Sequence, residues 1–242
     1  MSHLLVDIGN SGVKSAVASC GAIVSSCREK LVGDSTAGLG LACGISRGIY
    51  SSVRELSDEE MSVLDSFAFP VMKLSCRTAL PLKIGYSTPE TLGPDRIAAA
   101  VGAWSVCRGR NLLVIDAGTA ITYDLVTADG TFVGGNITPG VSLRLRALHE
   151  YTGKLPLVRA EGPMPLVGDS TETAIRSGVV QGVRDEMQGC VGRLSARYGD
   201  IFVFLTGGDA HLFEKPIKNG IFADGSLVFK GLECICSFNE ID

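Results

Sequence analysis

Near its start the chain reads Asp7-Ile8-Gly9-Asn10-Ser11-Gly12-Val13-Lys14, directly after the apolar residues 4–6. A second stretch of similar design, Asp116-Ala117-Gly118-Thr119-Ala120, follows the apolar residues 112–115 in the other half of the chain. In both, an acid ends an apolar strand, a glycine stands two residues further on, and an amide or hydroxyl residue precedes a second, alternating strand. We interpret the two stretches as corresponding β-hairpins of a duplicated fold.

The chemistry of these hairpins suits the phosphates of a nucleotide. A carboxylate can hold a hydrated cation, and a glycine turn offers backbone N–H groups to phosphate oxygens. One such stretch is weak evidence because Asp-x-Gly is common in turns, whereas two copies, one in each half, favour a fold that closes on a nucleotide. The better-known phosphate loops are absent: Val13 separates Gly12 from Lys14, which breaks the Walker pattern, and no Gly-x-Gly-x-x-Gly occurs.

Composition narrows the class of protein. At 242 residues and 45% hydrophobic content, the chain can bury one large core or two domains of about 100–130 residues. The net charge is −4 and the basic residues are scattered, so we expect no nucleic-acid partner. No 18-residue apolar run or signal-peptide pattern is present, so we expect no membrane partner either. The eight cysteines are dispersed without a Cys-x-x-Cys pair, which favours buried free thiols in a cytoplasmic protein.

The hydrophobic pattern predicts an α/β protein of two halves that meet near residues 108–111. The first half is expected to contain three strands up to Cys27, an inner strand over 48–53, a helix over 56–67 capped by Ser57 or Asp58, and a helix over 97–107 with Asp95 as its N-cap. The second half is expected to contain strands over 112–115, 120–126 and 201–205, an Asp129-Gly130 turn, and helices over 141–151, 173–198 and 226–238. The longest helix carries an apolar stripe from Ile175 to Leu194, which suits either the core or a dimer interface.

Two further motifs gain weight from their place in this order. Thr206-Gly207-Gly208-Asp209-Ala210 ends a buried strand, and its glycines would let a flat base or ribose lie against the backbone. Gly93-Pro94-Asp95-Arg96 opens a helix. Taken alone, the first is better explained as a plain turn, and the second as a helix start with an Asp cap and a surface arginine. Together with the two hairpin stretches they form a set of four motifs, and it is this set, in this order, that indicates a catalytic site.

This order resembles that of the type III pantothenate kinases, members of the acetate kinase–sugar kinase–Hsp70–actin superfamily, along essentially the whole chain. The narrowest parts of the resemblance are Gly-x-Asp-Arg at 93–96, preceded by Tyr86, and Gly-Gly-Asn-Ile-Thr-Pro-Gly at 134–140. The resemblance implies two ribonuclease-H-like domains, built as duplicated βββαβα-type units, with a nucleotide cleft between them. The domains would span residues 1–110 and 111–242.

The resemblance also implies a reaction, in which ATP phosphorylates the terminal hydroxyl of pantothenate in the first step of coenzyme A biosynthesis. In phosphoryl transfer the protein mainly positions groups and neutralises charge. Asp95 is then expected to be the general base, and Arg96 to offer a planar fork to the pantothenate carboxylate or the transferring phosphoryl group. Asp116 is expected to bind potassium or ammonium, with magnesium brought by ATP. The residues expected to bind ATP are Asp7, Ile8, Gly9, Asn10, Ser11, Gly12, Val13, Lys14 and Thr119. Those expected to bind the substrate are Tyr86, Gly93, Pro94, Asp95, Arg96 and Thr171.

At two positions the match to the family's motif is not settled by the sequence. Thr171 matches the family's substrate-contacting threonine, but Thr173 lies two residues away and is an alternative. Ser11 stands where the family often has threonine, which keeps the hydroxyl and loses a methyl group. The family typically forms a dimer whose pocket is completed across the interface, so a homodimer is expected, with the apolar stripe as one possible surface.

Other functions fit parts of the sequence. A superfamily kinase for another small alcohol or carboxylate is the nearest alternative, and residues 93–96 distinguish it because sugar kinases build their acceptor site differently. A non-catalytic nucleotide-binding regulatory or accessory factor would be favoured by loss of Asp95 or of a hairpin acid, but all three acids are present. An actin-like polymerising protein is disfavoured because the chain is too short to add the extra subdomains.

Overall fold

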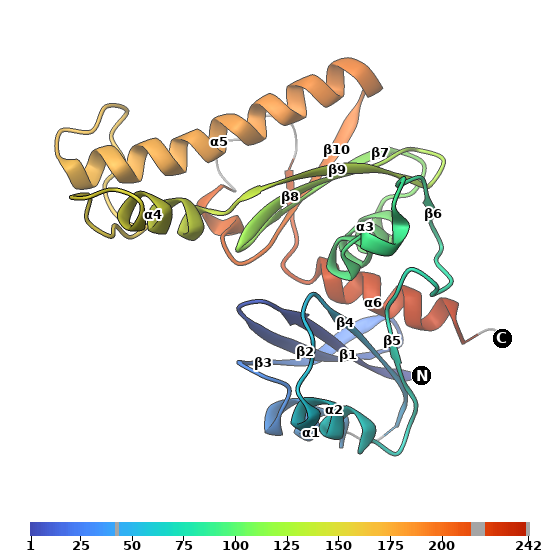
Figure 1. Cartoon of the computed structure of the whole chain (residues 1–242). Helices are drawn as coiled ribbons and strands as arrows, with labels where there is room; N and C mark the ends of the chain where they lie inside the picture. Colours follow the sequence, from blue (N-terminus) through green and yellow to red (C-terminus); the bar gives the residue numbers. More distant parts are fainter. Residues whose placement is uncertain (42–43, 214–220, 241–242) are drawn as a thin grey trace. The chain divides into compact units, whose positions relative to one another are not determined.

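The computed structural model describes residues 1–41, 44–213 and 221–240, and the chain forms two compact units (Figure 1). Unit 1 comprises Met1–Gly109, Leu125–Gly134 and Ser226–Asp242, and unit 2 comprises Arg110–Asp124 and Gly135–Gly225. The domain division at 110/111 stays a prediction. The two compact units are defined by contacts between residues, and these contacts assign Ser226–Asp242 to unit 1.

The first sheet, in unit 1, has the strand order β3-β2-β1-β4-β5. Its strands are β1 (Ser2–Gly9), β2 (Gly12–Ser19), β3 (Ala22–Glu29), β4 (Ile45–Ser52) and β5 (Val71–Lys73). The central strand β1 pairs antiparallel with β2 and parallel with β4. Because β1 is covered on both faces, its consecutive residues Leu4, Leu5 and Val6 are all fully buried. The predicted hairpin at residues 7–14 is confirmed.

The second sheet repeats this plan. Its order is β11-β10-β7-β8-β9-β6, with strands β6 (Lys83–Ile84), β7 (Asn111–Ala117), β8 (Ala120–Val126), β9 (Thr131–Pro139), β10 (Ile201–Thr206) and β11 (Ile221–Ala223). Apart from the edge strand β6, the order from β9 to β11 matches that from β3 to β5. The strand β10 lies parallel to β7, as β4 lies parallel to β1. The predicted duplicated α/β fold is therefore confirmed, and β7 is the counterpart of β1.

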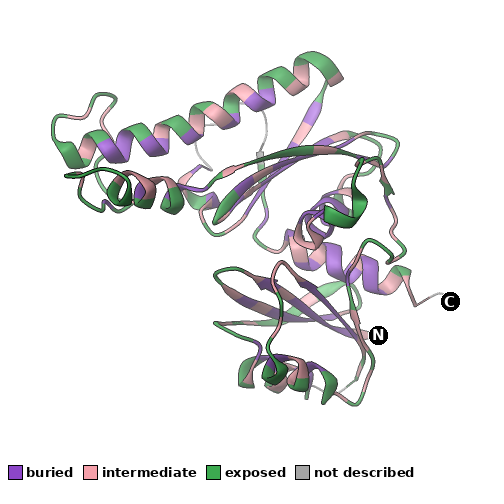
Figure 2. Ribbon diagram, viewed as in Figure 1, coloured by how far each residue is buried: buried purple, intermediate pink, exposed green. Residues whose placement is uncertain are grey.

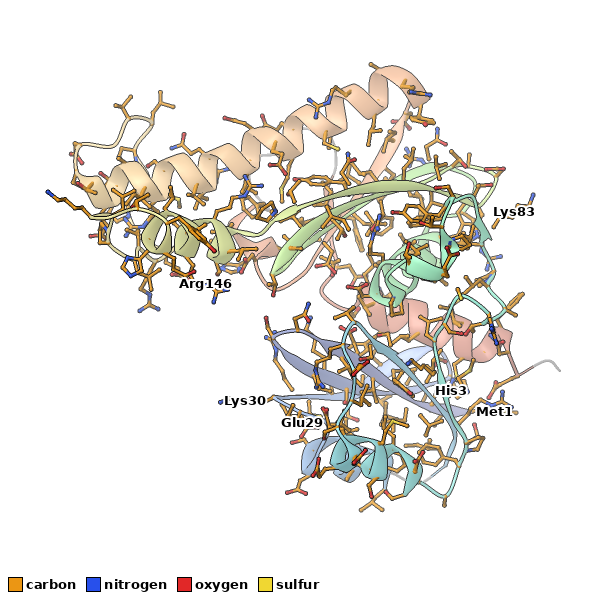
Figure 3. The ribbon with its side chains drawn as sticks, in the orientation of Figure 1. Met1, His3, Glu29, Lys30, Lys83 and Arg146 are labelled. Atoms are coloured by element: carbon orange, nitrogen blue, oxygen red, sulfur yellow. The ribbon has the colours of Figure 1, made fainter. Side chains whose placement is uncertain are left out.

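The helices of unit 1 are α1 (Asp34–Gly40), α2 (Asp58–Asp65), α3 (Pro94–Val106) and α6 (Leu227–Phe238), with a short 3₁₀ turn η1 (Pro89–Thr91). The N-cap of α2 is Ser57, one of the two predicted alternatives, and it forms a capping box with Glu60. The helix α1 escaped prediction because its sequence contains two glycines. Glu29 holds its start by accepting hydrogen bonds from the backbone N–H groups of residues 33, 35 and 36 (Figure 3).

In unit 2, α4 (Val141–Glu150) and the strand β10 pack against the long helix α5 (Thr171–Tyr198), and a 3₁₀ turn η2 (Ala210–Leu212) follows β10. Buried residues lie along one side of α5 (Figure 2). The predicted apolar stripe supplies five of them: Ile175, Val179, Val183, Met187 and Val191 are each at most 8% exposed. The stripe is therefore core within a single chain, and its buried side chains are not free to meet a second one.

The described residues bear on two further expectations. Seven cysteines lie in the described part of the chain and all are free thiols, while Cys43 lies outside it. The prediction that the thiols are buried holds for Cys190 and Cys236 and is wrong for the other five, of which Cys20 and Cys76 are exposed. None of the helices in the described ranges combines the length and the apolar character that a bilayer crossing needs.

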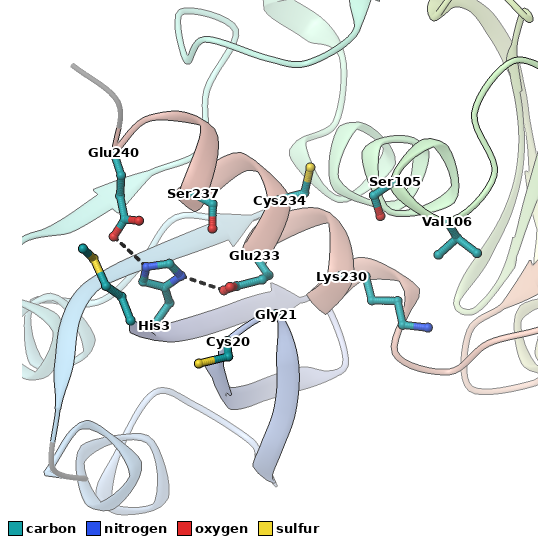
Figure 4. A pocket seen from close by; sticks show the side chains of 11 residues that line it. His3, Cys20, Gly21, Ser105, Val106, Lys230, Glu233, Cys234, Ser237 and Glu240 are labelled. Atoms are coloured by element: carbon teal, nitrogen blue, oxygen red, sulfur yellow. Dashed lines mark hydrogen bonds and ion pairs between the residues drawn. The ribbon is translucent and has the colours of Figure 1, made fainter.

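His3 joins the two ends of unit 1. Its Nδ1 lies 2.7 Å from Glu233 Oε2 and its Nε2 lies 2.7 Å from Glu240 Oε1, so one imidazole links β1 to α6 and to the residues after it (Figure 4). The ring is 2% exposed. The hydrogen bond with Glu233 raises the pKa of His3 above its ordinary value of 6.5, and the contact with Glu240 adds to this, while burial opposes both. Because both nitrogens face carboxylates, the doubly protonated ring fits the site best.

This arrangement predicts a pH-dependent stability. Because the folded-state pKa of His3 is raised, its contribution is fully present below pH 6.5 and is lost as the pH rises through the folded-state value. Replacing His3 with Gln removes the imidazolium and leaves two carboxylates close together. We expect the variant to lose roughly 2 kcal/mol of unfolding free energy at pH 6, and less at pH 9. Denaturant titrations across this pH range measure the difference in unfolding free energy. A difference that does not change with pH would rule out a stabilising contribution from the protonated His3 ring.

Candidate active site

Asp7 stands at the end of β1 with a polar partner on each neighbouring strand. The strand register pairs it with Lys14 of β2 and with Ser51 of β4. The Ser51 hydroxyl donates to Asp7 Oδ1 at 2.9 Å. Burial raises the pKa of Asp7, and the charge of Asp95 raises it further, against the opposing effects of Ser51 and Lys14. At the hairpin tip residues 10 and 11 are exposed, as a ligand-binding turn requires.

Asp95 lies in the first turn of α3. The helix begins at Pro94 with Gly93 as its N-cap, so the prediction that Asp95 is the cap is wrong. Proline favours the first helical position because its missing N–H would have no partner there. Asp95 Oδ1 instead accepts a hydrogen bond from the backbone N–H of Arg96 at 2.8 Å. Burial raises the pKa of Asp95, although the Arg96 N–H and guanidinium lower it. Unit 1 therefore brings together two acids, Asp7 and Asp95, that both hold protons more tightly than usual.

Arg96 is not the surface arginine of the simplest interpretation. It is 6% exposed, and its guanidinium carbon lies 5.6 Å from the centre of the Tyr86 ring and 5.8 Å from that of Phe132. The two rings meet edge to face at 6.1 Å. Such contacts orient a guanidinium and partly desolvate it. The sequence predicts Tyr86 at this site but misses Phe132, whose only signal is a place in a strand beyond the Asp129-Gly130 turn.

Unit 2 repeats the acidic hairpin. Asp116 lies near the end of β7, and the register places it opposite Thr206 of β10, just as Asp7 lies opposite Ser51 of β4. Thr119 is exposed at the hairpin tip. Each acid is thus flanked by a hydroxyl residue on the neighbouring parallel strand. The two hairpins therefore occupy equivalent places in the two sheets.

Two glycines pack against the Asp116–Thr119 turn. Gly207 has a φ of +99°, and a Cβ added there would lie 2.5 Å from Asp116 Oδ1 and would strike the Ala117 carbonyl oxygen. Gly140 donates its N–H to the Thr119 carbonyl oxygen at 2.9 Å, and a Cβ there would lie 2.6 Å from the same oxygen. Both positions therefore require glycine for the close approach of backbone to the turn.

The two threonines at the start of α5 differ in their contacts. Thr173 takes part in a capping box with Ser170, and its hydroxyl also contacts Asp169 Oδ1 at 3.0 Å. Thr171 is the first residue of the helix and is exposed. The hydroxyl of Thr173 is thus committed to the helix start. Thr171 is the better placed of the two for contact with a ligand.

The donor atoms around Asp116 suit a hard cation. Besides its own carboxylate, the turn offers backbone carbonyl oxygens, and Ala117 O and Asp116 Oδ1 both crowd the position that a side chain at residue 207 would fill. Among the described residues no group of three or more His, Cys, Asp or Glu side chains could hold a metal ion. Oxygen ligands suit hard cations, whereas a zinc-type site is built mainly from cysteine and histidine.

The fold, with its paired hairpins, is a duplicated α/β fold of the class that includes the actin-like sugar kinases. Solved structures show the same fold: a protein of Campylobacter jejuni assigned to the Baf family of transcriptional activators aligns with a TM-score of 0.64 at 21% identity, over 99% of this chain and 100% of that one. A ROK hexokinase of Thermus thermophilus aligns with a TM-score of 0.51 at 14% identity, over 100% of both chains.

Sequence comparison identifies the family within this class. The type III pantothenate kinase family matches residues 3–193. A type III pantothenate kinase of Phocaeicola vulgatus is 44% identical over 241 residues, which cover 98% of this chain and 99% of that protein. The chain belongs to the type III pantothenate kinase family. It is a kinase that phosphorylates pantothenate in coenzyme A biosynthesis, and its use of ATP implies a divalent cation such as magnesium.

Proposed function

We propose that Asp95 is the general base that activates the terminal hydroxyl of pantothenate for attack on ATP. The hydroxyl proton passes to the Asp95 carboxylate as the oxygen bonds to the γ-phosphorus, and the bond to the β-phosphate oxygen breaks to release ADP. The observation that carries this proposal is a half-buried carboxylate whose pKa is raised, held in the first turn of α3. A base with a raised pKa is better matched to proton transfer near neutral pH than an ordinary aspartate.

The residues around Asp95 bind the acceptor in this proposal. Arg96, oriented by the rings of Tyr86 and Phe132, presents its guanidinium to the pantothenate carboxylate or to the transferring phosphoryl group. Tyr86 lines the substrate site, and the backbone of Gly93 and Pro94 shapes it. From the resemblance to the family, and not from a contact in unit 1, Thr171 of unit 2 is proposed as a further contact to the substrate.

The two hairpins bind ATP in this proposal. The backbone of residues 9–11 and Thr119 hold phosphate oxygens, with the rest of residues 7–14 forming the first phosphate-binding hairpin. Asp7 faces the magnesium that accompanies ATP, which neutralises charge on the phosphate oxygens. Lys14, opposite Asp7 in the strand register, adds a positive charge beside the same turn. The exposed hairpin tips support these roles.

The choice of acceptor is tested directly by an activity screen. The purified protein is incubated with ATP, magnesium and potassium, and pantothenate is compared with glycerol, acetate and hexoses for ADP release. Pantothenate is expected to be the only one of these compounds that stimulates release. Stimulation by another acceptor without stimulation by pantothenate would reject the assignment.

We further propose that Asp116 binds a monovalent cation, potassium or ammonium. Its carboxylate and the neighbouring carbonyl oxygens support this assignment. Replacing potassium with sodium is expected to lower turnover by about tenfold or more, because a smaller, more strongly hydrated ion fits such a site poorly. Asp116→Ala should remove this ion preference together with most of the turnover. Equal steady-state rates in the two salts would contradict the proposal.

We also propose that the protein acts as a cytoplasmic homodimer. Free thiols throughout the described residues suit a reducing compartment. The support for a dimer, apart from the family, is a set of exposed apolar side chains in unit 2: Tyr151 at 85%, Leu166 at 87% and Val167 at 80%. Sedimentation at micromolar concentration should give about twice the chain mass of 25.4 kDa. A fully active monomer would reject the dimer.

A further inference from the structure

One carboxylate in the middle of α5 collects hydrogen bonds from three other elements of unit 2. Glu186 Oε1 accepts from the Tyr123 hydroxyl of β8 and from the Thr138 hydroxyl of β9, each at 2.8 Å. Its Oε2 lies 2.7 Å from the Arg144 guanidinium of α4. None of the roles proposed above uses this group. Because the inward side of α5 is otherwise largely apolar, we asked whether this carboxylate has a role besides stabilising the fold.

Two of the contacts of Glu186 lead to residues 138–140, where β9 ends and α4 begins; this segment is called the β9–α4 turn below. Arg144, besides its ion pair, donates from Nε to the Pro139 carbonyl oxygen at 2.7 Å and from Nη2 to the Thr138 hydroxyl at 3.3 Å. The ion pair is only about one-quarter exposed, with the Arg144 side chain at 24% and that of Glu186 at 29%. Burial by itself raises the pKa of Glu186, but the donors Arg144, Tyr123 and Thr138 outweigh it and lower the pKa below its ordinary value. Glu186 is therefore ionised at neutral pH and holds residues 138 and 139 from one side.

The next residue along the chain joins this turn to the nucleotide hairpin. Gly140 is buried, donates its N–H to the Thr119 carbonyl oxygen at 2.9 Å, and lies too close to the backbone of residues 118 and 119 to carry a side chain. A displacement of Thr138 and Pro139 would thus carry Gly140 with it and disturb Thr119. The contacts form a continuous path from Glu186 through the β9–α4 turn to the Asp116–Thr119 turn.

We propose that Glu186 is a positioning residue for the reaction: through its ion pair with Arg144 and its hydrogen bond from Thr138, it holds the β9–α4 turn against Thr119 and so fixes the phosphate- and cation-binding turn. This inference rests on the proposed roles of Asp116 and Thr119. It separates the contacts of one carboxylate by what they hold. The contacts with Arg144 and Thr138 control the binding turn, whereas the contact with Tyr123, which shares Oε1 with Thr138, serves the stability of unit 2.

The test compares Glu186→Gln, which keeps the shape and an acceptor oxygen but loses the ion pair, with Tyr123→Phe, which removes a donor from the same carboxylate without touching the turn. For Glu186→Gln we expect the KM for ATP and the potassium activation constant each to rise by about tenfold, with a much smaller change in kcat. For Tyr123→Phe we expect lower thermal stability and unchanged constants. Arg144→Gln should reproduce the effect of Glu186→Gln, and the double variant should be no worse than the worse single variant.

The outcomes distinguish this inference from the function on which it rests. If Asp116→Ala loses the potassium response while Glu186→Gln keeps wild-type constants, the positioning role is wrong and the cation site stands. If Asp116→Ala keeps the wild-type response, the cation site fails and the inference falls with it. Should Glu186→Gln not fold, Arg144→Gln replaces it, because this substitution removes the same ion pair and leaves the hydrogen bonds of Glu186 with Tyr123 and Thr138 in place. A rise in both constants would support the proposal, and wild-type constants would overturn it.

Discussion

Asp95→Asn is expected to lower kcat by about 10²–10⁴-fold, equivalent to roughly 3–5 kcal/mol of activation free energy. Asparagine is nearly isosteric with aspartate, and its side-chain oxygen can still accept the hydrogen bond from the Arg96 N–H. Because Gly93 and not Asp95 caps α3, the substitution removes no cap from the helix. We therefore expect ATP binding and the thermal midpoint to stay close to wild type, and steady-state kinetics to show the loss in turnover.

Arg96→Lys is the informative companion to this variant. Lysine keeps the positive charge but loses the planar fork and its stacking between Tyr86 and Phe132, so the KM for pantothenate should rise at least as much as kcat falls. The two substitutions thus separate proton transfer from acceptor binding. Near-wild-type turnover in Asp95→Asn would reduce Asp95 to a structural residue of the first turn of α3.

Gly207→Ala is expected to have the second large effect. At a φ of +99° a side chain costs roughly 1–3 kcal/mol of strain, and the close contacts of its Cβ with Asp116 and Ala117 cost about as much again. Because the clash falls on the Asp116 carboxylate, we expect lower stability together with a weaker response to potassium. Thermal unfolding and potassium titration of activity measure the two effects.

Gly208→Ala provides a matched control for this substitution. A Cβ at Gly208 has no atom within 4 Å, and its φ lies outside the left-handed region. We expect the control to retain wild-type stability and potassium response to within the usual scatter of surface substitutions, about 0.5 kcal/mol. Similar losses in both variants would show that the contact between Gly207 and Asp116 is not the cause.

The sequence predicts the parts of the fold that have a strong local signal. The hairpin at residues 7–14, the strand pairs of both halves and the long helix α5 follow from apolar runs, alternation and helical period, all of which local sequence records. The Asp129-Gly130 turn is likewise confirmed, with Gly130 at a φ of +81°. The start of α3 was misassigned because an aspartate near a helix start usually caps it, whereas here proline occupies the first position and displaces the cap to Gly93.

The parts that escaped prediction depend on contacts between distant segments. Phe132 reaches Arg96 only once the β8–β9 hairpin lies beside α3, and Ser51 meets Asp7 only through the parallel register of β1 and β4. Glu186 offers no motif at all, since its partners come from three elements remote in sequence. The apolar stripe of α5 left core and interface equally open, because periodicity records that a face is buried but not what buries it.

The most direct test of the central claim, that the Asp95 carboxylate takes the proton from pantothenate, is the pH dependence of kcat/KM for pantothenate in the wild-type protein and in Asp95→Asn. Asp95 must be deprotonated to act as a base, so wild-type activity should fall as the pH drops through its raised pKa, which lies above the ordinary value of 3.8. Asp7 also has a raised pKa, and the comparison with the variant separates the two acids. The account predicts that Asp95→Asn retains a low residual rate without the acid limb of the wild-type profile. The same limb at the same pH in the variant would contradict it.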